Sequence, residues 1–187
     1  MSISKNNYYL YIENSKILDL SLIKKREKFA IIYRISKNKE DFKSIIKFRR
    51  ECKKKGIGFF VANNYMLANK CKADGLYLSS YNKKYYDKKK LKLIGSAHNT
   101  KEIYEKKKQG CKIIFLSRLF KTDYIDKKSF YGVVKFNLLV LDKKIKFVPL
   151  GGIRIKNLNK LNMINSDSLA VLSEIKKKPT KIISRLF

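Results

Sequence analysis

Short apolar runs alternate with helix-like segments along the chain, and this alternation restricts the possible folds more than any other feature. Eight runs rich in Ile, Val, Leu, Tyr and Phe predict strands, at residues 8–12, 29–35, 57–62, 75–78, 92–96, 112–117, 146–150 and 168–172. Helical spacing or helix caps mark the segments at 15–28, 40–54, 66–71, 99–109, 131–141, 157–163 and 179–187. Repeated strand–helix units predict a parallel sheet covered by helices. We therefore expect an α/β fold, a compact (β/α)8 TIM barrel, with a doubly wound open sheet as the alternative.

The length of the chain favours a single domain. With 187 residues and 44% hydrophobic side chains, the chain can bury one well-packed core but is short for two. We expect one barrel domain over residues 1–187, with helices shorter than usual, because such barrels typically have about 250 residues. Cys52, Cys71 and Cys111 stand singly, so they indicate neither a zinc site nor a disulfide framework. They are predicted to be buried filler residues.

The formal net charge of +30 comes mostly from lysine, which is spread over every predicted helix and loop. Proteins that bind nucleic acid usually gather arginine and aromatic side chains on one surface, so a dedicated nucleic-acid role is not expected. The overall field favours phosphorylated, anionic ligands. Because there is no apolar stretch of 18 residues and residues 1–7 are too polar for a signal peptide, we expect a soluble cytoplasmic protein without a membrane partner. The sequence leaves the oligomeric state open.

A strand that ends at two adjacent glycines is the most informative local signal. Gly151 and Gly152 follow the run at 146–150, and without Cβ atoms their backbone can approach a ligand closely. A helix from Asn157 onward would point free N–H groups back at that ligand. An ordinary strand-to-helix turn also uses glycine, so the motif alone leaves both interpretations open. In TIM barrels the last two βα loops commonly bind phosphate, and here these are the Gly-Gly turn and the loop at Ser173.

Polar or small residues follow nearly every predicted strand. In a parallel barrel these positions meet at one end, so they predict one shared pocket. The positions are Arg34, Asn63, Asn64, 79–82, 96–98, 117–122, Gly151, Gly152 and Ser173.

Five short motifs at these strand ends carry a family resemblance. They are Val61-Ala-Asn-Asn64 with Ala73-Asp-Gly-Leu-Tyr-Leu78, Ile94-Gly-Ser-Ala-His98, Phe115-Leu-Ser-Arg-Leu-Phe-Lys-Thr122, Leu150-Gly-Gly-Ile153 and Ala170-Val-Leu-Ser173. In this order they resemble the motifs of the thiamine phosphate synthase family, including its thiazole tautomerase branch. The resemblance implies a transferase of thiamine biosynthesis that joins hydroxymethylpyrimidine diphosphate to thiazole phosphate and releases pyrophosphate.

The resemblance also implies roles for individual residues, carried over position by position. The expected catalytic residues are Arg34, Ser96 and His98, and the expected substrate-binding residues are Asn63, Arg118, Thr122, Gly151, Gly152 and Ser173. Arg34, Asn63 and Ser96 would face the pyrophosphate, whereas the threonine, the two glycines and Ser173 would hold the thiazole phosphate. His98 is the sole histidine, and it either acts on a proton or orders its loop. Arg118 either clamps a phosphate or points outward.

The chain departs from the family pattern at the metal positions. Asn64 and Asn82 stand where the family carries two metal-binding aspartates. Magnesium prefers carboxylate oxygen, so the resemblance implies Mg²⁺ as a cofactor with weakened anchoring. Asparagine is also a good helix cap, which is an alternative role for Asn63 and Asn64.

Two other departures keep further functions open. The family's second strand ends in Gln-x-Arg-x-Lys, and the same places here hold Ile32, Arg34 and Ser36. The tautomerase branch carries a histidine at the place of Arg118, so that residue argues against tautomerisation by the family's route. The alternative function is therefore a non-catalytic or tautomerase-like relative that binds thiazole phosphate.

Overall fold

The computed structural model describes residues 5–24, 26–35, 40–87, 91–122, 129–141, 144–172, 175, 177 and 179–184. Within them, every predicted strand is present with small changes at its ends. The strands are β1 (Asn7–Ile12), β2 (Phe29–Tyr33), β3 (Gly58–Ala62), β4 (Gly75–Leu78), β5 (Lys92–Ala97), β6 (Ile113–Ser117), β7 (Lys146–Leu150) and β8 (Ser168–Val171).

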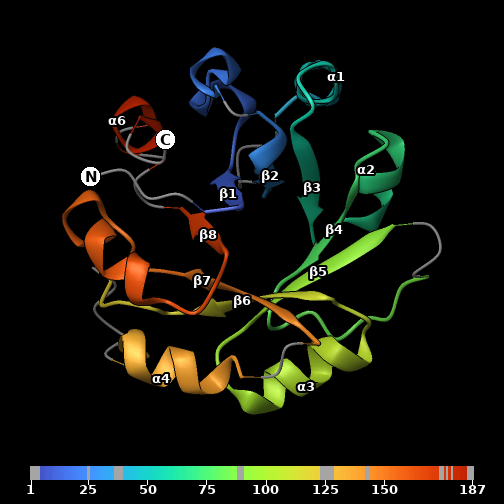
Figure 1. Ribbon diagram of the computed structural model, residues 1–187. Helices are drawn as coiled ribbons and strands as arrows, with labels where there is room; N and C mark the ends of the chain where they lie inside the picture. The colour runs from blue at the N-terminus through green and yellow to red at the C-terminus, as the bar shows by residue number, and fades with distance from the viewer. Residues whose placement is uncertain are drawn as a thin grey trace.

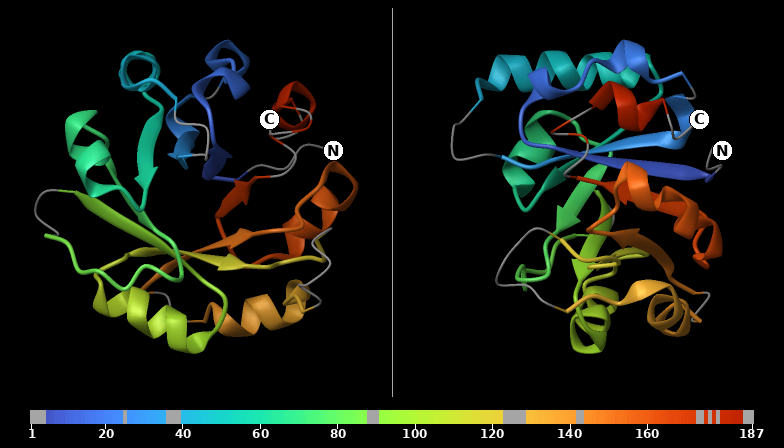
Figure 2. Two further views of the ribbon diagram at one scale, coloured as in Figure 1. Left: turned by 180° about the vertical axis from the view of Figure 1, so that it is seen from behind. Right: turned by 90° about the vertical axis from the view of Figure 1, so that its left-hand side faces the viewer.

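The eight strands form one parallel sheet that curls into a nearly closed barrel (Figure 1). Neighbouring strands follow the order β7-β6-β5-β4-β3-β2-β1-β8, which is the chain order with β8 placed beside β1. A doubly wound sheet would reverse its strand order at a switch point, and this sheet has no such reversal. The TIM-barrel prediction is therefore confirmed. Among the described strands, β7 and β8 lie at the two ends of this order and close the ring by proximity (Figure 2).

Helices cover the outside of the barrel (Figure 1). They are α1 (Phe42–Lys54), α2 (Tyr65–Lys70), α3 (Thr100–Lys108), α4 (Gly132–Leu139) and α6 (Pro179–Ile183). Asparagine side chains start two of them, because Asn64 accepts a hydrogen bond from Leu67 N at the start of α2 and Asn99 accepts one from Glu102 N at the start of α3. As the chain length predicts, α2 and α6 have only six and five residues.

The predicted helix at 15–28 is wrong. This segment forms three short 3-10 turns instead, η1 (Ser15–Ile17), η2 (Leu20–Leu22) and η3 (Arg26–Lys28). The side chains of Asn14 and Asp19 accept hydrogen bonds from backbone N–H groups two residues onward, and each bond closes a separate turn in place of a continuous helix. The predicted helix at 157–163 is likewise a 3-10 helix, η4 (Ile155–Met163).

The barrel interior is filled by its own side chains. Its inner cluster consists of Tyr9, Tyr11, Ile32, Phe60, Ala62, Tyr77, Ile94, Ile113, Phe115, Val148, Leu150 and Ala170. The rings of Tyr9 and Phe115 meet edge to face at 4.9 Å, and those of Tyr11 and Tyr77 do so at 5.4 Å. Since the interior is closed by these rings, ligand space is confined to an end of the barrel. The three cysteines are free and buried, as predicted.

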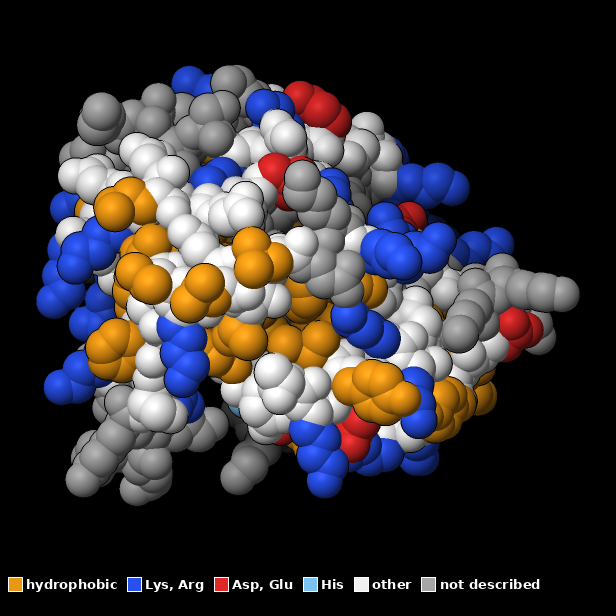
Figure 3. Space-filling view, turned by 60° about the horizontal axis from the view of Figure 1, so that its bottom comes forward, with side chains coloured by type: hydrophobic (Ala, Val, Ile, Leu, Met, Phe, Trp, Pro, Cys, Tyr) orange, Lys and Arg blue, Asp and Glu red, His pale blue; other side chains and the backbone are white. Residues whose placement is uncertain are grey.

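The outer side of α4 is unusually apolar. Val134 and Leu138 are 75% and 64% exposed, and only Phe136 of this helix is buried against the barrel. Figure 3 shows apolar side chains gathered on this side of the molecule among scattered lysines and arginines. In the described part of the chain, no helix has both the length and the apolar character needed to cross a membrane.

Candidate functional site

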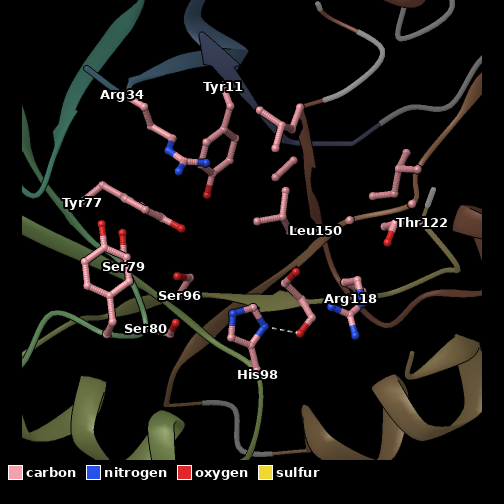
Figure 4. Close-up of a pocket in the computed structure, with 17 residues that line it drawn as sticks. Tyr11, Arg34, Tyr77, Ser79, Ser80, Ser96, His98, Arg118, Thr122 and Leu150 are labelled. Carbon is pink, nitrogen blue, oxygen red and sulfur yellow. Dashed lines mark hydrogen bonds between the residues drawn. The ribbon is translucent and has the colours of Figure 1, made fainter. Parts of the chain in front are cut away.

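A cavity of about 460 Å³ opens at the carboxyl ends of the strands (Figure 4). Its walls contain seven of the predicted site residues: Arg34, Ser96, His98, Arg118, Thr122, Gly151 and Gly152. Asn63 and Asn64 instead line a smaller neighbouring hollow of about 250 Å³, which shares Arg34 and Tyr81 with the main cavity. Ser173 lies outside the described residues. The predicted shared pocket at the strand ends is present, and the asparagines lie at its edge.

Arg34 brings an uncompensated positive charge to the cavity. The residue follows β2, where its backbone N–H donates to Ile12 O at 2.9 Å and fixes its position. Its half-buried guanidinium forms no hydrogen bond or ion pair with the described residues, and Figure 4 shows it directed into the cavity. A free guanidinium can bind a phosphate through two parallel hydrogen bonds. This geometry suits the predicted contact with pyrophosphate.

His98 is oriented by the neighbouring strand. Its Nδ1 lies 2.8 Å from Ser117 O at the end of β6, and a carbonyl can only accept, so Nδ1 carries the hydrogen of this bond (Figure 4). The backbone around it is also held, because His98 N donates to Glu102 Oε2 at 2.7 Å and the hydroxyl of Tyr131 donates to His98 O. In the neutral ring, Nε2 is then a hydrogen-bond acceptor. The geometry supports loop ordering and leaves one nitrogen for a ligand.

The Gly-Gly turn lines the cavity and carries backbone N–H groups without a partner in the described chain. Gly151 and Gly152 have φ angles of +90° and +70°, and their carbonyls accept hydrogen bonds from Phe120 N and from the side chain of Asn157. Their own N–H groups donate to no other group in the described chain. Thr122 lies beside them, and its buried hydroxyl has no hydrogen-bond partner there. Unpaired donors of this kind can bind an anion.

Packing also explains why residue 152 is glycine. A Cβ atom at Gly152 would lie 2.3 Å from Phe120 O and 2.7 Å from Lys121 O. The two glycines were predicted to let a ligand come close to their backbone. In the structure, the backbone that follows β6 already lies this close to Gly152. This contact places the loop at Thr122 against the turn, so both interpretations of the motif, ligand loop and tight turn, are consistent with the geometry.

Arg118 is held by a backbone carbonyl at the cavity wall. Its Nε and Nη2 donate to Ser129 O at 3.1 and 2.7 Å. A carbonyl is neutral, so the positive charge of the guanidinium remains available, and its other N–H groups are unused by this contact. The side chain lines the cavity and is not turned out among the surface lysines.

Asn63 uses its whole amide to connect the ends of β3 and β4. Its Oδ1 accepts from Ser79 N at 2.9 Å and from Asn82 Nδ2 at 3.1 Å, while its Nδ2 donates to the hydroxyls of Ser79 and Tyr81. The residue has φ +57°, which asparagine tolerates better than most residues. With both amide hydrogens and both acceptor positions engaged, the side chain of Asn63 shapes the loop after β4, and its predicted contact with substrate stays a prediction.

The two residues predicted at the metal positions do not fit a magnesium site. Asn64 Oδ1 accepts the capping hydrogen bond from Leu67 N at 2.9 Å, and Asn82 Oδ1 accepts from Lys84 N at 3.0 Å. Both oxygens are neutral and already bonded, whereas magnesium requires a nearly octahedral set of oxygens anchored by carboxylate. The described residues contain no cluster of three His, Cys, Asp or Glu side chains that could hold a metal.

A buried lysine fixes the loop after β4, although no sequence pattern distinguishes it from the many other lysines. Lys106 is fully buried, and its Nζ donates to Asn82 O at 2.7 Å and to Gln109 Oε1 at 2.8 Å. The amide nitrogen of Gln109 donates to Asn82 O and to Lys84 O. Burial lowers the pKa of Lys106 below its ordinary value. Helix α3 thus holds the loop that carries Asn82.

Sequence reasoning missed two residues that line the cavity, Tyr11 and Tyr77, whereas Ser79, Ser80 and Ser117 lie there as the strand-end pattern predicts. Tyr11 and Tyr77 form its floor and point inward from β1 and β4, and burial raises the pKa of both phenols. Their inward orientation follows from the two-residue period of a strand. That period does not reveal which inward residue is the last before the pocket.

Comparisons with known proteins show which family the chain resembles. The model of the family described as thiamine monophosphate synthase matches residues 15–175. A thiamine-phosphate synthase of Clostridioides difficile is 27% identical over 178 residues, covering 91% of this chain and 81% of that protein. One from Prochlorococcus marinus subsp. pastoris is 28% identical over 180 residues, covering 91% of this chain, and this chain spans only about half (51%) of that relative's length.

A solved structure supports the same assignment at the level of the fold. The thiamine phosphate pyrophosphorylase from Pyrococcus furiosus superposes with a TM-score of 0.74 at 21% identity, covering 98% of this chain and 94% of that one. Since the family model spans most of the chain, the protein belongs to the thiamine monophosphate synthase family.

Proposed function

We propose that the protein is a thiamine phosphate synthase-like transferase, which joins hydroxymethylpyrimidine diphosphate to thiazole phosphate and releases pyrophosphate. The observation that carries this proposal is a single cavity with two separate sets of free anion-binding groups. Arg34 supplies one, and Thr122 with the N–H groups of Gly151 and Gly152 supplies the other. Figure 4 draws Arg34 and Thr122 on opposite sides of the cavity, with Leu150 between them. This arrangement suits two substrates that each carry phosphate.

The reaction asks the protein for charge stabilisation and alignment. The bond between the pyrimidine methylene carbon and the diphosphate oxygen breaks, and its electron pair leaves on pyrophosphate. The lone pair of the thiazole nitrogen then forms the new C–N bond to that carbon. No proton has to move in either step. Arg34 would stabilise the negative charge that builds up on the departing pyrophosphate, and the hydroxyl of Ser96, which lines the cavity, would add a hydrogen bond.

His98 and Arg118 support this assignment from the cavity wall. Because Ser117 O holds Nδ1 of His98, its Nε2 can accept a hydrogen bond from a substrate group. Arg118 keeps its positive charge beside the Gly-Gly turn, where a Cβ atom on Gly151 would come within 3.1 Å of its Cγ. Its place next to the turn favours the thiazole phosphate as its ligand. Ser173, the remaining residue predicted for that phosphate, stays a prediction.

A non-catalytic binder of thiazole phosphate is the second candidate function, and one observation favours it. Thr122, Gly151 and Gly152 line the cavity with unpaired groups, whereas the amides at the expected metal positions, Asn64 and Asn82, are engaged within the protein. Such a binder would retain affinity for thiazole phosphate and would never release pyrophosphate. Arg118 stands where the tautomerase branch has histidine, so no residue at that place supports proton transfer.

The test measures thiamine phosphate and pyrophosphate from purified protein given both substrates, with Mg²⁺ and with a chelator. Arg34→Ala is expected to lower kcat/KM roughly a hundredfold, since it removes one preorganised charge contact to the leaving group. Arg50→Ala is the matched control, because this arginine is exposed on α1 and lies outside the cavity. Product that needs both substrates supports the transferase. Binding of thiazole phosphate without product under either condition refutes it in favour of the binder.

A further inference from the structure

Two buried hydroxyls at the cavity have no hydrogen-bond partner among the described residues, those of Thr122 and Tyr11, and the proposed phosphate contact accounts only for Thr122. Tyr11 is 1% exposed, and its Oη has no hydrogen-bond partner among the described residues. Native proteins rarely bury a hydroxyl in this way, because the group loses its water without gaining a partner. Where it occurs, the unpaired group calls for an explanation, and a bound ligand is one.

The surroundings of Tyr11 explain why the protein offers no partner. Its ring packs edge to face against Tyr77 at 5.4 Å and Phe115 at 6.0 Å, and its partner in the strand ladder is Ile32. The phenol of Tyr77 lies close enough to add, by electrostatic and hydrogen-bonding interaction, to the rise that burial causes in the pKa of Tyr11. The two hydroxyls do not meet full hydrogen-bond geometry, so Tyr11 Oη is left without a well-formed hydrogen bond in the described chain. The hydroxyl of Tyr77 has Ser96 as a second neighbour, on the side of the cavity away from Tyr11.

The orphan hydroxyl faces the cavity. Tyr11 lines it together with Arg34, and Figure 4 shows the phenol pointing into the open space beside the guanidinium. The adjacent walls are apolar, formed by Leu150, Ala170 and the ring of Tyr77. The planar ring of a substrate can stack on these apolar side chains. A polar atom at the edge of that ring would then lie near the uncharged hydroxyl of Tyr11, which can donate a hydrogen bond to it.

We propose that Tyr11 Oη donates a hydrogen bond to a ring nitrogen of the heteroaromatic substrate bound over this floor, which makes Tyr11 a specificity-determining residue. The identity of that ring as the pyrimidine of the diphosphate substrate rests on the proposed function. A neutral phenol among aromatic rings suits a ring nitrogen better than a phosphate, which requires charge or several donors. Arg34, beside it, would then hold the diphosphate that the same substrate carries.

Tyr11→Phe separates this role from a structural one. Removing an unpaired buried hydroxyl should raise, or at least preserve, the melting temperature of the free protein. The same change should weaken binding of hydroxymethylpyrimidine diphosphate on the order of tenfold, the usual upper effect of one neutral hydrogen bond. Affinity for inorganic pyrophosphate should stay unchanged. A hydroxyl that only supports the fold would give the reverse pattern, a lower melting temperature with ligand affinities unchanged or lowered together.

Tyr9→Phe is the matched control. Tyr9 also lies inside the barrel on β1 and packs on Phe115, but it does not line the cavity. Calorimetry with the pyrimidine diphosphate, inorganic pyrophosphate and thiazole phosphate on the wild type and both variants gives the comparison. Selective weakening of the pyrimidine ligand in Tyr11→Phe alone supports the proposal.

Two outcomes distinguish this inference from the proposed function. Wild-type affinity and KM in a Tyr11→Phe variant that still makes product would overturn the inference and leave the transferase standing. A wild-type protein that binds pyrophosphate but not the pyrimidine diphosphate would overturn both.

Discussion

Substitution of Gly152 by alanine tests the contact that shapes the phosphate side of the cavity. Two effects add at this position. The φ angle of +70° disfavours any residue with a Cβ atom, by about 1 kcal/mol. The new Cβ would also lie 2.3 Å from Phe120 O, 2.5 Å from Phe120 C and 2.7 Å from Lys121 O, and these are backbone atoms that cannot rotate away. Forcing such a contact apart costs about 1 to 3 kcal/mol. We expect Gly152→Ala to lower the free energy of unfolding by about 2 to 4 kcal/mol.

Gly56 is a matched control, because substitution there has the backbone effect without the steric contact. It has a φ angle of +66°, and nothing lies within 4 Å of a Cβ atom built there. Gly56→Ala should therefore show only the backbone effect, about 1 kcal/mol. Denaturant unfolding of both variants at one temperature gives the two free energies, and the slope of each transition shows whether the unfolding mechanism has changed. The difference between the variants measures the contact between the Gly-Gly turn and the backbone after β6.

Binding provides the second readout. If the turn and the loop at Thr122 form one anion site, Gly152→Ala should weaken thiazole phosphate binding, and Gly56→Ala should not. Equal destabilisation by the two substitutions would refute the close approach at residue 152. A large difference in stability with unchanged phosphate affinity would keep the packing argument and refute the anion site.

Two further predictions concern alkaline pH and metal binding. Burial raises the pKa of Cys52 from 9.0 to about 12, so the unfolded chain loses the thiol proton first. The stability that this thiol contributes is therefore complete below pH 9 and is lost as the pH rises from 9 toward 12. In denaturant titrations, the free energy of unfolding of Cys52→Ala should fall less between pH 8 and pH 10 than that of the wild type. An equal decline in both proteins would contradict this assignment. Titration calorimetry should detect no Mg²⁺ binding to the wild type and clear binding to the double variant Asn64→Asp with Asn82→Asp. Aspartate can still cap α2, and the two substitutions add two carboxylates. Mg²⁺ binding of equal strength in both proteins would refute the conclusion that the two asparagines do not fit a magnesium site.

The strands could be predicted because their apolar runs are short and clearly separated, and their parallel order follows from the intervening helices. The segment after β1 could not, because Leu18, Leu20 and Ile23 look like a helical face while Asn14 and Asp19 close local turns that the hydrophobic pattern does not register. Here a side-chain hydrogen bond over two residues outweighs the periodicity of the segment.

The candidate site could be predicted where it depends on strand ends and not where it depends on long-range hydrogen bonds. Arg34 and the Gly-Gly turn were found because position along a strand determines where they lie. The engagement of Asn63 depends on Ser79 and Asn82, which come from another loop. Lys106 offered no signal, because one lysine among many on a helix gives no indication that it alone is buried.

The side-chain amides at the cavity edge hold the loops in place but carry no charge. Asn63 ties the ends of β3 and β4 together through Ser79 and Asn82, and Lys106 holds the same loop from α3, so this edge is shaped by the protein alone. A metal ion there would have given both shape and two positive charges. The hydrogen bonds of Asn63 and Lys106 hold this edge of the cavity in place, as a metal ion would, but they supply none of its charge. In the proposed reaction, the stabilisation of a departing pyrophosphate would fall to Arg34, which faces both hollows without a partner in the described chain, and to the field of a protein with a net charge of +30. Under this proposal, neutral amides at the expected metal positions are compatible with an excess of lysine, because the positive field would supply part of the charge that a metal ion would otherwise provide.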